Sequence, residues 1–329
     1  MTVFGKLRRA LLTPNVKETT MAVRGFHVKN DTGRDLLETV GKSFLDGFAE
    51  AAEARTAQDV VAPLADVPVR FRGFAYEGAG MAFAIRDATG LGRGLTRAFL
   101  EGPGRPHIYM AYVGVGWAMA RLPRPLWRGL YAPDPLLRWL VLDGYGFHQA
   151  YFKTSQYVFE QYRHTNFSWP AGGPGWYADR VIDQGVGRAM WFVGGADPQL
   201  VARMIDRFAE DRRSDLYAGA ALAATYAGAA QEDELRDFRE RAGQYRPELA
   251  QGCAFAAAAR VKADLLVPHN SLATQVFCGA TPQEASDITD VTLEQPGTAP
   301  AGTTVRPGTP EYELWRQRIA GQFVALGRC

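Results

Sequence analysis

The chain repeats part of itself, and this repeat constrains the fold more than any other feature of its 329 residues. The segment EGAGMAFAI, which begins at Glu77, resembles QGVGRAMWF, which begins at Gln184, so the offset is 107 (184 − 77). DGYGFHQAYF from Asp143 resembles QGCAFAAAAR from Gln251 at an offset of 108 (251 − 143). Matches that share one offset are the mark of tandem structural units.

A third match lies between the other two and completes the pattern. IYMAYVGVGWAMA resembles LYAGAALAATYAG at an offset of 108 (216 − 108). We therefore predict one compact body in four parts, with helical units of about 107 residues between a lead-in and a tail. The parts are lead-in helices over 1–69, repeat unit 1 over 70–165, repeat unit 2 over 175–265, and C-terminal helices with a loop over 266–329.

Helical spacing of apolar residues, with almost no β-branched alternation, predicts an all-α fold. In the lead-in, apolar residues at 36, 37, 40, 44, 45 and 48 predict a long helix. Asp197 is the expected N-cap of a helix that begins with Pro198. The motif glycines are expected near helix starts, where they let helices approach, while the acid or amide before them caps free N–H groups.

The two units differ in ionisable residues. Glu77 and Asp143 each match a glutamine in the second unit, and His148 matches an alanine. A duplicated scaffold that keeps acid–base chemistry in one half would differ in this way, so these three residues are the candidate catalytic groups. Gly144, four residues before His148, is expected to leave space under the imidazole. The alternatives remain a hydrogen-bonded core histidine and a motif that serves only packing and capping.

Aromatic and polar residues on the repeat segments are candidates for a substrate pocket, since small-molecule sites combine apolar walls with a few polar groups. Aromatic stripes of this kind also occur in ordinary cores, and that alternative stays open. The candidates are Tyr109, Trp117, Tyr145, Tyr151, Gln184, Arg188, Trp191, Tyr217 and Gln251.

Composition and motifs exclude several classes. A net charge of +2 lacks the excess of basic residues that is typical of nucleic-acid-binding proteins. Three scattered cysteines, without metal-ligand spacing, predict free thiols in the cytoplasm and no metal. No P-loop, GxSxG elbow or strand-linked GxGxxG occurs, so no cofactor is expected. The arginine-rich, lysine-poor composition favours a GC-rich bacterial source such as an actinobacterium.

No stretch has the length of a transmembrane helix, and the apolar run near the N-terminus is too short for a signal peptide. The segment FGKLRRALL is expected to be a docking arm, with contact to a membrane surface as the alternative.

Several segments resemble a family of uncharacterised bacterial proteins. RGFAYEGAGMAFAI, HIYMAYVGVGWAMARLP, DPLLRWLVLDGYGFHQAYF, DQGVGRAMWFVGGAD, DLYAGAALAATYAG and LAQGCAFAAAAR carry the resemblance, which runs from about residue 20 to 280. Members of this family recur in gene clusters for enediyne antibiotics. The resemblance implies a role in building the polyketide-derived enediyne core or in handling its precursors. It supplies no catalytic residues.

Two functions follow as hypotheses. The first is a cofactor-independent enzyme that cyclises or isomerises a hydrophobic polyene or polyketide intermediate, with Glu77, Asp143 and His148 moving protons. The second is a non-catalytic helical protein that binds or delivers this intermediate, or that docks on the polyketide synthase as a scaffold.

Overall fold

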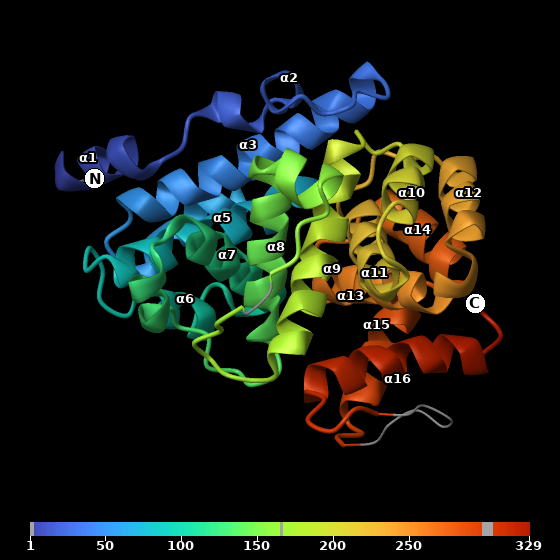
Figure 1. The fold of residues 1–329 in the computed structure, drawn as a ribbon. Helices are drawn as coiled ribbons and strands as arrows, with labels where there is room; N and C mark the ends of the chain where they lie inside the picture. The colour runs from blue at the N-terminus through green and yellow to red at the C-terminus, as the bar shows by residue number, and fades with distance from the viewer. Residues whose placement is uncertain (1–2, 165–166, 298–304) are drawn as a thin grey trace.

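The fold is built from helices, as Figure 1 shows. The structure is a computed structural model that describes residues 3–164, 167–297 and 305–329, and within these ranges it contains helices and no strand, which confirms the predicted all-α class. The first half contains α1 (Val3–Leu12), α2 (Met21–Arg24), α3 (Asp31–Glu53), α4 (Val61–Ala65), α5 (Val69–Ala88), α6 (Leu95–Glu101), α7 (Ile108–Arg121) and α8 (Trp139–Phe152). The second half contains α9 (Gly175–Val193), α10 (Pro198–Asp206), α11 (Glu210–Ala227), α12 (Glu232–Ala242), α13 (Arg246–Lys262), α14 (Pro268–Cys278), α15 (Pro282–Leu293) and α16 (Glu311–Ala325).

The long helices follow one another around the interior. Each of α3, α5, α7, α8, α9, α11 and α13 packs against the next, and α15 and α16 lie against α13 (Figure 1). The Arg260 side chain on α13 brings the last of these helices back to the first. Its Nη2 donates to the Arg70 carbonyl of α5 at 3.0 Å and to the Tyr226 carbonyl of α11 at 2.6 Å. The six helices α5, α7, α8, α9, α11 and α13 therefore surround a common interior, and we call them the helix ring.

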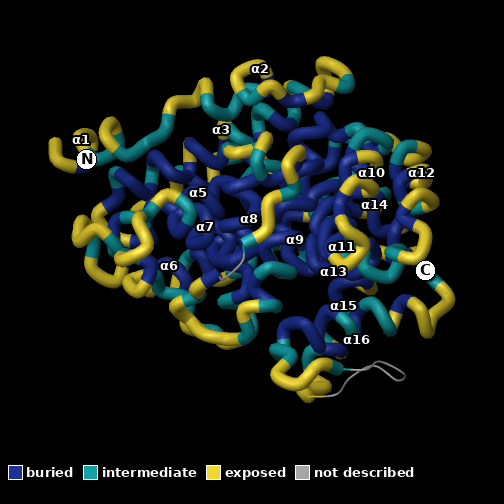
Figure 2. Tube along the Cα trace, viewed as in Figure 1, coloured by how far each residue is buried: buried dark blue, intermediate teal, exposed yellow. Residues whose placement is uncertain are grey.

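The inner helices are buried on nearly every side. In α8, every residue from Trp139 to Tyr151 is buried, and Figure 2 shows the same for most of the central helices. A helix that is apolar all round belongs inside a protein, which explains why these segments lack a polar face. The exposed residues gather in the outer helices, such as α1 and α12.

The motif glycines are the points at which neighbouring helices touch. A Cβ on Gly144 would lie 2.1 Å from the carbonyl oxygen of Val113 on α7. A Cβ on Gly146 would lie 2.2 Å from the carbonyl oxygen of Ile182 on α9. No side chain fits at such distances, so the first glycine of the pair contacts the preceding helix and the second contacts the following one.

This contact pattern recurs from helix to helix, so the shortest period is one helix. The pair is complete in four helices and reduced to its first glycine in α11 and α13; the residues are Gly78 and Gly80, Gly114 and Gly116, Gly144 and Gly146, Gly185 and Gly187, then Gly219 and Gly252. Each predicted unit of about 107 residues spans three such helices. The contacts pair Gly114 with Gly219, at an offset of 105 (219 − 114), so the predicted middle alignment is shifted by three residues.

The prediction that the motif begins helices is wrong. Asp143 and Gly144 lie inside α8, which begins at Trp139. Interior N–H groups of a helix are already bonded to its own carbonyls, so Asp143 has none to cap. The expected space beside Gly144 is also filled, because the α7 main chain at Val113 occupies it.

Two local predictions are confirmed. Asp197 caps α10, since its side chain accepts from the N–H groups of Gln199 and Leu200 at 2.9 and 3.1 Å. The N-terminal segment docks on α3, where Arg8 donates from Nε to the Ala52 carbonyl at 3.1 Å. No helix in the described ranges has both the length and the apolarity to span a bilayer. A loop was predicted within the C-terminal part over 266–329, and residues 298–304 of this part lie outside the described residues.

Candidate functional site

The interior of the helix ring contains a first cavity of about 760 Å³, including its opening. Helices α3, α5, α7, α8, α9 and α11 contribute its walls, and most of the lining is apolar or aromatic. The wall residues deep in the cavity include Phe44, Phe74, Glu77, Met81, Trp117, Phe147, Tyr151, Arg188, Phe192, Leu222 and Tyr226. The rim includes Pro14, Glu18, Thr19, Arg121 and Phe152.

A second cavity of about 490 Å³ lies on the other side of Arg188. It is enclosed by α7, α8, α9, α11, α13 and α16, and its lining is also mostly apolar. The lining residues are Tyr109, Met110, Val113, Leu140, Asp143, Arg188, Leu222, Tyr226, Phe255, Ala256, Ala258, Ala259, Tyr312 and Trp315.

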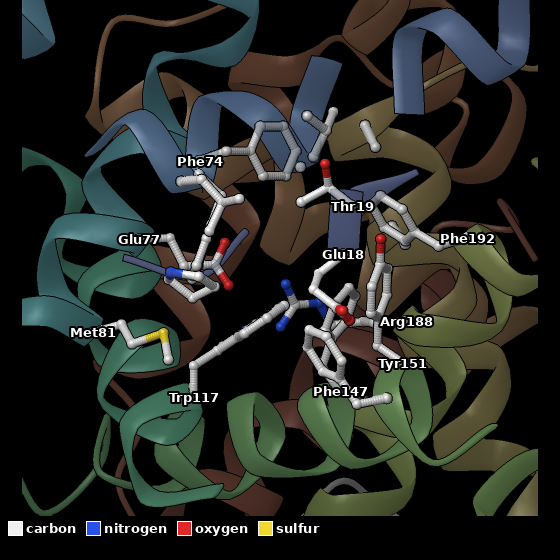
Figure 3. A pocket seen from close by; sticks show the side chains of 18 of the residues that line it. Glu18, Thr19, Phe74, Glu77, Met81, Trp117, Phe147, Tyr151, Arg188 and Phe192 are labelled. Carbon is white, nitrogen blue, oxygen red and sulfur yellow. The ribbon is translucent and has the colours of Figure 1, made fainter. Parts of the chain in front are cut away.

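Three residues, Arg188, Leu222 and Tyr226, line both cavities and so form the partition between them. Glu77 lines only the first cavity, and Asp143 lines only the second. Figure 3 shows the Glu77 carboxylate and the Arg188 guanidinium directed into the first cavity from opposite walls. The partition therefore carries one arginine with a carboxylate on each side. We call Glu77, Asp143 and Arg188 the cavity cluster.

Helix α9 positions the arginine of this cluster. Gln184 and Arg188 lie one turn apart, so both side chains reach α8 from the same face. Arg188 Nη1 forms an ion pair with Asp143, and Gln184 Nε2 donates to the second oxygen of Asp143 at 2.9 Å. The guanidinium also lies 5.0 Å from the centre of the Phe147 ring. Burial lowers the pKa of Arg188, but Asp143 and Glu77 outweigh it, so the pKa lies above its ordinary value and the side chain is charged.

Glu77 is the member of the cluster that can exchange a proton near neutral pH. It is 3% exposed and forms no ion pair with any residue the structure describes. Burial raises its pKa to about 7, Arg188 opposes this shift, and Asp143 adds to it. An acid whose pKa lies near the working pH is suited to both donating and accepting protons.

Two polar atoms of the partition have no hydrogen-bond partner among the described residues. They are Nε of Arg188 and the hydroxyl of Tyr226. Buried polar groups in proteins are almost always satisfied, so such atoms beside a cavity indicate a place where a polar group of a bound molecule could be held.

His148 lies apart from the two acids. Its Nε2 accepts a hydrogen bond of 2.8 Å from Arg121 Nε, and its ring packs against Trp117 and Phe152. Burial, reinforced by Arg121 and Lys153, lowers its pKa to about 3, so it is neutral. Of the three candidate catalytic groups, Glu77 and Asp143 lie on either side of Arg188. His148 is outside both cavity linings and holds a rim arginine instead.

The nine predicted pocket residues divide in the structure. Tyr109, Trp117, Tyr151 and Arg188 line one or both cavities. The other five are buried elsewhere. Gln184 has its partner on α8, inside the repeat, and the other four have partners in outer helices and loops that the repeat does not reveal. Gln184 binds Asp143, Tyr145 packs on Phe167, Trp191 donates to the Gly228 carbonyl, Tyr217 stacks on Tyr245, and Gln251 accepts from Arg316.

Sequence reasoning missed several residues of the walls. Phe44 and Phe74 precede the repeated segments, Leu222 and Tyr226 follow the motif glycine of α11, and Tyr312 and Trp315 come from α16. The α16 residues carry no signal in the repeat, since the C-terminal helix has no counterpart in it. Tyr226 could have been found from the sequence, because it lies about two turns after Gly219 on the same face of α11.

A second buried group of charges, which we call the closed cluster, lies near the N-terminal ends of α9 and α11. Asp215 accepts from Arg180 at 2.8 Å and from Arg316 at 2.8 Å. Glu313 accepts from the same two arginines at 2.7 and 3.1 Å. Two carboxylates and two guanidinium groups thus satisfy one another, and they attach α16 to the ring. None of the four lines either cavity.

Metal-ligating side chains do not gather in the described part of the chain: no group of three or more His, Cys, Asp or Glu there could hold a metal ion.

Comparison with known proteins gives one result. No curated protein and no solved structure matches the chain significantly. A family described as "Protein of unknown function (DUF1702)" matches residues 3–323, a range that runs from the start of α1 to near the end of α16 and includes both cavities and both charged clusters. Since this match covers nearly the whole chain, the protein belongs to the DUF1702 family.

Proposed function

We propose that the protein binds a hydrophobic polyene or polyketide intermediate in the first cavity and isomerises or cyclises it by proton transfer. The observation that supports this most directly is Glu77: a buried carboxyl with a pKa of about 7, facing a cavity whose other deep walls are largely apolar and aromatic. Such a cavity suits a flat, conjugated, apolar molecule. The resemblance of the repeat segments to proteins of enediyne gene clusters points to an enediyne precursor as the substrate.

The proposed reaction is neutral in protons and electrons. Protonated Glu77 donates its proton to one carbon of the polyene, and the positive charge spreads along the conjugated chain. The faces of Trp117, Phe147 and Tyr151 line the cavity and stabilise a cation there. The Glu77 carboxylate, stabilised by Arg188, then takes a proton from another carbon, so that double bonds move or a ring forms without any oxidant.

Asp143 and His148 have supporting places in this proposal. Asp143 holds Arg188 charged and oriented beside Glu77. His148 orients Arg121 at the rim and takes no part in proton transfer.

The test is a turnover assay in deuterium oxide with the linear polyene released by the polyketide synthase. Glu77→Gln is expected to lower the rate of ultraviolet spectral change and of deuterium incorporation by about 10²- to 10⁴-fold. Glu232→Gln, on the exposed face of α12, is the matched control and is expected to retain the wild-type rate. Equal rates in wild type and Glu77→Gln would contradict the proposed chemistry.

Delivery without catalysis is the second candidate, and one observation favours it. Apart from the cavity cluster, the deep walls of the first cavity offer aromatic and aliphatic contacts almost alone. A carrier for a reactive intermediate, docked on the polyketide synthase, would need no more than that. Tight polyene binding by quenching of tryptophan fluorescence, with no product and no deuterium incorporation, would favour this candidate.

A further inference from the structure

The two cavities share a partition made of side chains, and the main-chain walls continue from one to the other. Arg188, Leu222 and Tyr226 line both. Helices α7, α8, α9 and α11 contribute residues to both linings, so the same four helices enclose the space on each side of the partition.

Of the three residues of the partition, Leu222 has the side chain that can move most easily. It lies in the interior of the ring but is only half-buried, whereas its neighbours Ala221 and Ala223 on α11 are buried. The remaining exposure is consistent with its place between two cavities. An aliphatic side chain can change rotamer at little cost, in contrast to the ion-paired Arg188.

The wall of the second cavity is hollowed by small residues. Helix α13 contributes Ala256, Ala258 and Ala259 to it, beside the large rings of Phe255 and Trp315. Alanines opposite aromatic rings leave space that a larger side chain would fill. Ala256 stands where the first repeat unit has His148, so the small side chain at this position is specific to the second unit.

We propose that the two cavities are the two ends of one binding tract, that a long linear conjugated ligand spans both, and that an internal segment of this ligand lies at the partition. This inference rests on the proposed function for its ligand class and adds the length and position of the ligand. Glu77 on one side and Asp143 on the other then flank the middle of the chain. Proton exchange by Glu77 falls on an internal double bond, and the second cavity selects for ligand length.

The experiment compares binding of an all-trans linear tetraene and an all-trans linear octaene by quenching of tryptophan fluorescence. Wild type is expected to bind the octaene at least about tenfold more tightly, because the additional carbons are buried in the second cavity. Ala259→Phe, which fills that cavity, is expected to weaken octaene binding by about tenfold or more and to leave tetraene binding unchanged.

Leu222→Ala provides an independent variant in case Ala259→Phe does not fold. It opens the partition, so octaene binding is expected to be retained or strengthened while tetraene binding weakens through lost contacts. Leu200→Ala, on α10 and outside both linings, is the matched control and is expected to match wild type.

The outcomes separate the two proposals. Equal affinity of wild type for both polyenes, unchanged octaene binding in Ala259→Phe, or unchanged tetraene binding in Leu222→Ala overturns the two-cavity tract and leaves the proposed function standing. Length-dependent binding without loss of deuterium incorporation in Glu77→Gln supports the tract and contradicts the proton-transfer chemistry. If neither polyene binds, both proposals are overturned.

Discussion

The cavity cluster and the closed cluster are both buried groups of carboxylates and arginines, and they differ in how fully the charges are matched. In the closed cluster, two carboxylates meet two arginines, and each carboxylate accepts from both. In the cavity cluster, two carboxylates share one arginine, and only Asp143 is in direct contact with it. The unmatched acid, Glu77, faces open space.

This difference distinguishes a charged cluster that stabilises the fold from one that can take part in proton transfer. A matched cluster has no charge to spare, and its contacts hold helices together. An unmatched acid has its pKa raised by burial and keeps a proton that it can exchange. Three measurements test this difference between the two clusters.

The largest effect is expected in the closed cluster. Asp215→Asn leaves Arg180 and Arg316 with one carboxylate between them in a buried place, and such losses destabilise proteins by about 3–5 kcal/mol. Urea denaturation would measure the free energy of unfolding. Glu232→Gln removes an exposed ion pair with Arg236 and is expected to change it by less than about 1 kcal/mol. Equal losses in the two variants would show that the closed cluster does not hold the fold together.

The second effect concerns the paired half of the cavity cluster. Arg188→Met leaves Asp143 buried without its counter-charge and is expected to destabilise the protein by about 3 kcal/mol. Adding Asp143→Asn removes the stranded charge, so the double variant is expected to recover at least half of the loss in the same assay. A double variant that is less stable than Arg188→Met alone would mean that Asp143 stabilises the fold through contacts other than the arginine.

The third effect is a pH dependence that belongs to Glu77. Its pKa in the folded protein, about 7, lies above its ordinary value of 4.5, so the folded state binds the proton more tightly. The stability that Glu77 contributes is therefore complete below about pH 4.5 and is lost as the pH rises to about 7. The Glu77→Gln variant does not titrate at this position. Its stability relative to wild type is expected to increase across this window by on the order of 3 kcal/mol.

Unfolding free energies of both proteins at roughly pH 5, 7 and 8, which bracket the expected pKa, would measure this difference. A constant difference across the series would mean that Glu77 has an ordinary pKa, and the contrast between the two clusters would disappear.

The sequence predicted the class of fold and the acids of the site for definite reasons. Helical periodicity is local, so the long helix of the lead-in was expected from six apolar positions and appears as α3. Glu77 and Asp143 stood out because they are ionisable residues in a repeat whose other copy is neutral. Both lie in the cavity cluster.

The remainder of the site depends on contacts between distant segments. Trp191 and Tyr217 are aromatic residues of the repeat, yet they face α12 through Phe238 rather than the interior. Rotation of each helix about its axis decides which side chains face the cavity, and that rotation is fixed by the glycine contacts. The same limit applies to Tyr312 on α16, whose place in the second cavity follows from packing that has no local signal.

The glycine contacts between helices also separate the scaffold from its contents. Where main chain meets main chain, as at Gly144 and Gly185, the spacing of the walls does not depend on the side chains that face inward. Those side chains do not hold the helices together, so their shape, size and polarity can differ without a change in the spacing of the helices. The ring is thus a container whose lining can diverge while its frame stays constant, and one glycine pattern can serve chains that accommodate differently shaped molecules.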